Sequence, residues 1–186
     1  ISICLDWDSA TTTWVLRPTR NPASLFRYVL QHPANAQAVT DAQLDLTSIE
    51  DWHEYCEANK FIFDSIISDQ QSLLDVLRDV CASGRSSPTL IDGKWTVITD
   101  KPRTVTAQYF TPHNSWGFES TKALPKLPHA FRIPFKNADQ GYQPDEYIVY
   151  NDGYDATNAT LFEQMEFPGV TSRDAIHKHA RFHFAQ

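Results

Sequence analysis

The spacing of apolar residues changes once along this chain, close to Pro88, and that change constrains the fold more than any other feature. Before Pro88, apolar residues recur at helical spacing, as at Phe26, Val29 and Leu30. After it, short apolar runs alternate with prolines and turn residues, a pattern typical of strands. Helices in one half and strands in the other indicate an α+β fold.

Residues 1–90 are predicted to form a lobe of helices and strands. Two short strands within residues 1–17 precede a helix that starts at Asn21-Pro22 and stops at Pro33, because an Asx cap followed by proline marks a helix start. The further elements predicted in this lobe are a loop over 34–46, a helix capped by Thr47 or Ser48 that ends at Asn59 or Lys60, a strand over 61–67, and a helix from Ser68 or Asp69 to Gly84.

Residues 91–186 are predicted to form a mainly antiparallel β lobe, a sheet or partial barrel, with a C-terminal helix capped by Ser172. Asp92-Gly93 between two apolar runs predicts a hairpin turn. Further strands are predicted near 105–110, 129–136, 145–150 and 159–167. The pattern contains no flexible linker between the lobes, which is compatible with one compact unit.

Composition narrows the classes of function. A net charge of -7 with scattered Lys and Arg disfavours a nucleic-acid partner. No apolar run approaches the roughly 20 residues that cross a membrane. Cys4, Cys56 and Cys81 are widely spaced and odd in number, so we expect buried free thiols instead of a zinc or redox motif. The sequence begins in a strand-like pattern and ends in a helical one, which we interpret as a fragment of a longer polypeptide.

Asp6 and Asp8 are the first candidate catalytic residues. Two aspartates just past an apolar strand are how haloacid-dehalogenase-type phosphatases place a nucleophile and an acid/base. Ala10 stands where those enzymes have a small hydroxyl or valine, and no glycine-rich loop follows. We therefore interpret both aspartates as solvated turn residues.

Three other polar groupings are candidates for chemistry. His177, His179 and His183 fall in the last predicted helix, where the last two share a face and form a possible metal pair. The oxygen-rich stretch 151–155, with Asn158, resembles a calcium loop only loosely. The remaining grouping combines His113 and Ser115 with Asp100 or Asp92. Each lacks part of the required pattern, so we predict no catalytic, cofactor-binding or metal-binding residue.

Aromatic residues crowd the second half of the chain and are expected mostly to fill its core, although they can also anchor an interface or stack on a sugar or base. They are Trp95, Tyr109, Phe110, Trp116, Phe118, Phe131, Phe135, Tyr142, Tyr147, Tyr150 and Tyr154.

An ordered series of sequence blocks resembles the tail-tip attachment proteins of siphophages and prophages, the lambda-type host specificity protein J family. The first block reads Asn-Pro-Ala-Ser-Leu-Phe-Arg-Tyr-Val-Leu-Gln-His-Pro and begins at Asn21. The later blocks are 72–88, 92–95, 110–118, 127–132, 147–154 and 168–171. Together they extend the resemblance from about residue 20 to residue 186.

The resemblance implies a structural virion component in the central, baseplate-hub-like part of the tail tip, made in the bacterial cytoplasm. Its partners would be other tail-tip and tail-tube proteins, with self-association as a trimer in the full-length protein, and it would contribute to tail assembly and host attachment. The resemblance supplies no catalytic residue and no cofactor, which predicts a protein that is not an enzyme. A carbohydrate- or receptor-binding module, favoured by the aromatic density, and a hydrolase, based on Asp6, Asp8 and the histidines, are the alternatives.

Overall fold

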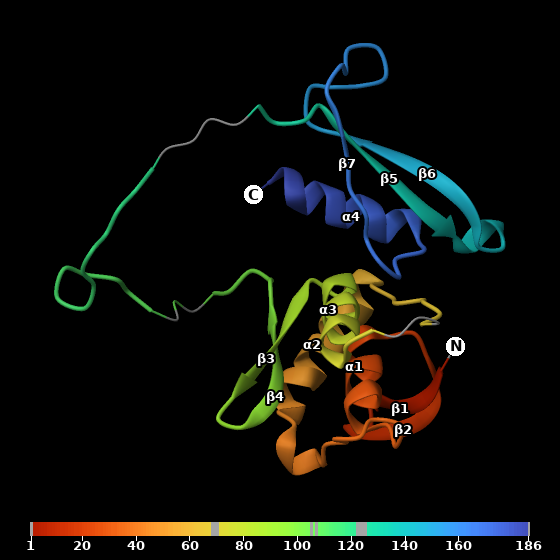
Figure 1. Cartoon of the computed structure of the whole chain (residues 1–186), viewed down its shortest axis with the longest axis vertical. Coiled ribbons are helices and arrows are strands. Elements are labelled where there is room, and N and C mark those ends of the chain that lie inside the picture. Colours follow the sequence, from red (N-terminus) through yellow and green to blue (C-terminus); the bar gives the residue numbers. More distant parts are fainter. Residues whose placement is uncertain (1, 68–70, 105, 107, 122–125, 186) are drawn as a thin grey trace.

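The chain folds into two tiers of secondary structure that lie one above the other (Figure 1). The computed structural model describes residues 2–67, 71–104, 106, 108–121 and 126–185. The first three α-helices and two hairpins form the lower tier, and a small sheet with the last helix forms the upper tier. This arrangement confirms the α+β prediction.

The lower tier begins with an antiparallel hairpin and a helix, as predicted. Strands β1 (Ser2–Asp8) and β2 (Thr13–Thr19) pair along their full length. Helix α1 (Pro22–Gln31) follows, and the Asn21 side chain accepts a hydrogen bond from the Ala23 backbone N–H, which satisfies one of the free donors at the helix start.

One predicted helix start differs from the structure, and another lies outside the described residues. After the short 3-10 helix η1 (Asp41–Gln43), helix α2 (Leu46–Asn59) is capped by Asp45 and not by Thr47 or Ser48. Ser48 is instead the donor, through its N–H and its hydroxyl, to the Asp45 carboxylate. Helix α3 (Leu73–Ser83) is capped by Ser72, and the predicted start at Ser68 or Asp69 lies outside the described residues.

Gly84 ends α3 as predicted, for a steric reason. A Cβ there would lie 2.8 Å from the Trp52 ring and from the Cys56 sulfur, too close for any side chain. The Trp52 indole N–H donates to the Gly84 carbonyl at 2.9 Å, and Trp52 is fully buried. All three cysteines are buried free thiols, as predicted.

The Asp92-Gly93 hairpin is confirmed. Strands β3 (Ser86–Ile91) and β4 (Lys94–Thr99) are antiparallel, and both turn residues have positive φ, 51° and 76°, as a type I′ turn requires. The hairpin crosses the predicted lobe boundary at residues 90 and 91, with β3 against α3 and β4 against α2 in the lower tier.

The upper tier is a three-stranded sheet whose central strand is β5 (Ala130–Asn137). Strand β6 (Gln143–Tyr150) pairs with it antiparallel and β7 (Phe162–Gln164) parallel, with the 3-10 helix η2 (Ala138–Gln140) between β5 and β6. The described strands close no barrel, because β7 pairs over three residues only and helix α4 (Arg173–Phe184) packs on β5 and β6. Ser172 precedes α4 as predicted, although its side chain makes no capping bond.

We call residues 101–128 the arm. The described part of the arm runs away from both tiers (Figure 1). A strand was predicted near 105–110, but residues 106 and 108–110 lie in no strand, and 105 and 107 are outside the described residues. The reason is that none of the described strands lies beside them to pair. None of the described helices is long and apolar enough to span a membrane.

Candidate functional site

The tiers are joined by the stretch from Phe61 to Asp64, which was predicted to be part of a strand. The Phe63 N–H donates to the Arg20 carbonyl of the lower tier, and the Asp64 N–H donates to the Gly169 carbonyl of the upper tier. Successive backbone donors therefore bond to different tiers. The predicted strand over 61–67 is wrong because its donors bond to two separate segments and not to one strand.

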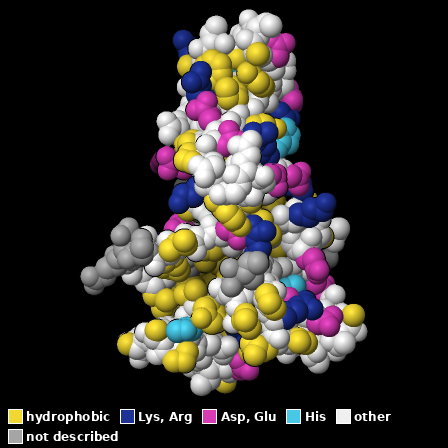
Figure 2. Space-filling view, turned by 90° about the vertical axis from the view of Figure 1, so that its right-hand side faces the viewer, with side chains coloured by type: hydrophobic (Ala, Val, Ile, Leu, Met, Phe, Trp, Pro, Cys, Tyr) yellow, Lys and Arg dark blue, Asp and Glu magenta, His cyan; other side chains and the backbone are white. Residues whose placement is uncertain are grey.

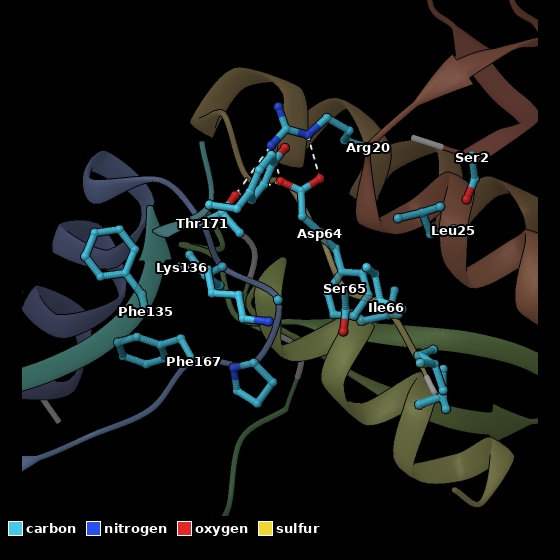
Figure 3. Close-up of a pocket in the computed structure, with 18 of the residues that line it drawn as sticks. Ser2, Arg20, Leu25, Asp64, Ser65, Ile66, Phe135, Lys136, Phe167 and Thr171 are labelled. Carbon is cyan, nitrogen blue, oxygen red and sulfur yellow. Dashed lines mark hydrogen bonds and ion pairs between the residues drawn. The ribbon is translucent and has the colours of Figure 1, made fainter. Parts of the chain in front are cut away.

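An ion pair reinforces this junction. The Arg20 guanidinium donates two hydrogen bonds to the Asp64 carboxylate, one of them from Nε at 2.7 Å. The Thr171 hydroxyl of the upper tier donates to the same carboxylate at 2.6 Å (Figure 3). Burial raises the pKa of Asp64, but the hydrogen bonds from Arg20 and Thr171 outweigh burial and hold that pKa below its ordinary value.

Gly169 allows the two tiers to approach closely. Its φ is +71°, and a Cβ at this position would lie 2.3 Å from the Phe63 ring. Only glycine combines the left-handed backbone with this close contact. Lys178 adds another bond between the tiers, because its ammonium group donates to the Asn59 carbonyl at 2.8 Å.

A cavity of about 770 Å³ lies between the tiers beside this junction. Its volume is in the range of sites for drug-sized ligands, and its walls are largely apolar. Apolar groups come from both tiers, among them Leu25, Val76 and Phe167. Figure 2 shows hydrophobic side chains gathered on this face of the molecule at and below the boundary between the tiers.

The mouth of the cavity combines exposed apolar and polar side chains. Ile66 is 91% exposed and Ile67 is 48% exposed. Lys136 and Ser65 lie on the walls (Figure 3). Among the described residues no carboxylate lies within ion-pair distance of Lys136.

Asp6 is buried and has a structural role in the lower tier, so its prediction as a solvated turn residue is wrong. Four side chains from β2, α1 and α2 contact its carboxylate: Arg17 Nε at 2.6 Å, the Thr19 hydroxyl at 2.7 Å, the Ser24 hydroxyl at 2.6 Å and His53 Nε2 at 2.9 Å. Burial raises the pKa of Asp6, but these hydrogen bonds outweigh it and hold the pKa at about 2.

Asp8 occupies a different environment from Asp6. It is half-buried, and its carboxylate accepts a hydrogen bond from the Ala10 N–H inside the β1–β2 turn, as a turn-forming aspartate does. The two aspartates therefore do not converge on a shared reacting position. Asp6 holds the hairpin to the helices, and Asp8 shapes the turn.

The three histidines of α4 point to different surroundings. His179 is buried, stacks on Phe61 with ring centroids 4.9 Å apart, and donates from Nε2 to the Ser83 carbonyl at 3.1 Å. Burial lowers its pKa to about 4. His177 and His183 are exposed. No group of three or more metal-ligating side chains occurs in the described part of the chain.

The oxygen-rich stretch 151–155 is an exposed loop held by its own hydrogen bonds. Asp155 accepts from the backbone and hydroxyl of Thr157, and the Asn158 amide donates to the Gly153 carbonyl at 3.0 Å. Asp152 pairs with Arg181 at 2.8 Å. The oxygen atoms of this loop thus take part in hydrogen bonds and an ion pair within the protein.

His113 and Ser115 lie on the arm, and no hydrogen bond among the described residues brings them together with Asp92 or Asp100. The Ser115 hydroxyl donates to the Thr111 carbonyl at 2.7 Å. Asp92 forms the β3–β4 turn. The grouping is therefore not an assembled triad.

The aromatic residues range from buried to almost fully exposed. Phe131 is buried, and Trp95, Phe135 and Tyr147 pack partly against the core. The aromatics of the arm are among the most exposed side chains: Tyr109 74%, Phe110 76%, Trp116 90% and Phe118 89%. The prediction of core packing is thus wrong for the arm, because the arm runs away from both tiers.

Arg20, Asp64, Thr171 and Lys136 were not identified from the sequence. Asp64 did carry a signal, because it stands inside the mostly apolar run from Phe61 to Ile67, and a charge inside such a run indicates a buried partner. The partner itself is remote, since Thr171 lies 107 residues further along the chain.

No protein-family model matches this chain, and no curated protein sequence matches it significantly.

The junction between the tiers predicts different costs for two glycine substitutions. Gly169 and Gly141 both have positive φ, 71° and 66°, but a Cβ at Gly141 meets no atom within 4 Å. Gly141→Ala should cost about 1–2 kcal/mol of unfolding free energy from backbone strain alone. Gly169→Ala should cost about 1–3 kcal/mol more, because Phe63 must move. Urea unfolding measures both values, and equal losses would contradict the close contact.

The buried histidine predicts a pH dependence of stability. The folded-state pKa of His179 lies below its ordinary value of 6.5, so the unfolded chain takes up the proton first as pH falls. The contribution of neutral His179 to the free energy of unfolding is fully present above pH 6.5 and decreases as the pH falls toward 4. About 2 kcal/mol of this free energy is lost between pH 7 and pH 5. Urea unfolding of His179→Gln should show a flatter profile over this range. His177→Gln, at an exposed position, is the control and should keep the wild-type profile.

Proposed function

We propose that this chain is a structural component of a siphophage or prophage tail tip, the baseplate-hub-like part of the tail attachment protein. The support from sequence is the ordered series of blocks between Asn21 and Thr171 that resembles that family. In this role the chain contributes folded mass and contact surfaces to an assembly at the virion tail tip. The proposed partners are tail-tube and tail-tip proteins and other copies of the same chain.

The observation that carries the proposal is the exposure of the block 110–118. This block belongs to the resemblance, yet Phe110, Trp116 and Phe118 are largely exposed to solvent. Burial of apolar surface stabilises a protein by about 25 cal/mol per Å², and large aromatic side chains that stay in water do not gain this free energy. Clustered exposed aromatics are typical of surfaces that another molecule covers.

The direct bonds between the two tiers are also compatible with a structural role. A subunit that transmits load or position within an assembly needs lobes that hold a fixed relation to each other. The backbone bonds from Phe63 and Asp64 and the contact between Gly169 and Phe63 supply that relation.

A carbohydrate- or receptor-binding module is the second candidate. The observation in its favour is the same set of exposed arm aromatics, since an exposed tryptophan such as Trp116 can stack on a sugar ring. On this alternative the arm would contact a host glycan and not another protein.

Immunogold labelling tests the structural role. Antibodies raised against the 186-residue chain should label the tail ends of purified particles from a strain that encodes it, and the label should be lost when its gene is deleted. Absence of the protein from purified tails would contradict the proposal. Glycan-array binding that Trp116→Ala abolishes, in a protein absent from tails, would favour the second candidate.

A further inference from the structure

The arm and the cavity between the tiers have complementary surfaces that are not satisfied within one molecule. The arm exposes Tyr109, Phe110, Trp116 and Phe118. The cavity has largely apolar walls, and Ile66 and Ile67 are exposed at its mouth. Each surface leaves apolar area in water that contact with the other would bury.

The arm and the cavity lie on opposite sides of the molecule. In Figure 1 the arm leaves the body on one side, whereas the N-terminus and the β5–β6 end, next to the cavity residues Ser2 and Lys136, lie on the other. Figure 2 shows that second side, with hydrophobic side chains gathered near the boundary between the tiers. In the conformation of the structure, no described residue of the arm lines the cavity of its own chain.

The arm and the rest of the chain also carry net charges of opposite sign. The arm has a net charge of +3, from four basic residues and one acidic residue: Lys101, Arg103, Lys122, Lys126 and Glu119. Because the whole chain has a net charge of -7, the residues outside the arm have a net charge of -10. Two acidic bodies repel each other, and a basic arm placed between them reduces that repulsion. The root of the arm already makes such a contact within its own chain, where Lys101 pairs with Asp51 of α2 at 2.5 Å.

The length of the arm permits this contact. The arm, 101–128, makes up 28 of the 30 residues that separate β4 from β5. Each limb of about 14 residues can reach roughly 45 Å when extended, enough to enter a neighbouring subunit.

We propose that the aromatic arm of one copy of this chain docks in the cavity between the tiers of a second copy. The contact is head-to-tail, so repeated contacts generate a closed ring or an open chain of subunits. Trp116 and Phe118 are the anchors, and Ile66 and Ile67 are the cavity residues that they cover. The inference names the partner within the proposed structural role and rests on that role.

Disulfide cross-linking between differently substituted chains tests the contact. All three native cysteines are buried, so a new surface cysteine reports its own contacts. Ser65→Cys places a thiol on the cavity wall, and Ser120→Cys places one beside Phe118 on the arm. Under mild oxidation, a mixture of the two variants should give a cross-linked dimer. Lys94→Cys, on the exposed β3–β4 hairpin and outside the cavity lining, is the matched control and should give none with Ser120→Cys.

Substitution of the anchors supplies the second measurement. Trp116→Ala with Phe118→Ala should weaken self-association measured by analytical ultracentrifugation by about tenfold or more, as expected for aromatic hot spots. Both side chains are exposed, so circular dichroism and the unfolding midpoint should stay unchanged. The same pair of substitutions in Ser120→Cys should abolish the cross-link.

Other results would overturn the inference. A chain that stays monomeric at high concentration and forms no mixed cross-link does not use this contact. A cross-link within single molecules of a Ser65→Cys, Ser120→Cys double variant at high dilution means that the arm docks on its own cavity. Either result in a protein that immunogold labelling still finds at tail tips removes the docking contact alone and leaves the proposed function standing.

Discussion

The backbone of residues 61–64 joins the two tiers, because its consecutive N–H groups at Phe63 and Asp64 donate hydrogen bonds to different tiers. Phe63 is bonded to the Arg20 carbonyl below, and Asp64 is bonded to the Gly169 carbonyl above. The Asp64 carboxylate repeats the same bridging pattern with Arg20 and Thr171. The cavity lies beside this junction, and Phe61, at its start, stacks on the buried His179.

The junction also relates the fold to the proposed role in an assembly. Once the tiers are fixed, the arm from 101 to 128 is anchored at both ends, and its aromatic side chains are presented away from the core. Two buried or half-buried aspartates make the contacts that join the elements of the fold. Asp6 joins β1 to β2, α1 and α2, and Asp64 joins the tiers.

Elements with local causes could be predicted from the sequence. The helix start at Asn21-Pro22 and the turn at Asp92-Gly93 depend on neighbouring residues only, and both were correct. The stretch 61–67 was not, since its apolar pattern is that of a strand but its bonding partners are set by tertiary contacts. The cap at Asp45 was missed because Ser48 fits the same local pattern as either cap or donor.

The candidate site was less predictable than the fold. Arg20, Asp64 and Thr171 are far apart in sequence, and no short motif links them. The prediction that the arm aromatics fill the core failed for a related reason. An aromatic side chain has the same preference for burial whether its own chain or a second molecule supplies the contact surface. Exposure of Trp116 and Phe118 became evident only with the fold.

The central claim is that the two tiers unfold as one unit. Urea unfolding monitored with one local probe in each tier tests this claim most directly. Trp7, Trp14, Trp52 and Trp95 all lie in the lower tier, so in a Trp116→Phe background tryptophan fluorescence reports on that tier alone. Amide NMR signals of Ile133 and Val149, both buried in the sheet, report on the upper tier. The account predicts urea transitions with the same midpoint for both probes. Two separate transitions would show that the tiers fold independently and would contradict the account.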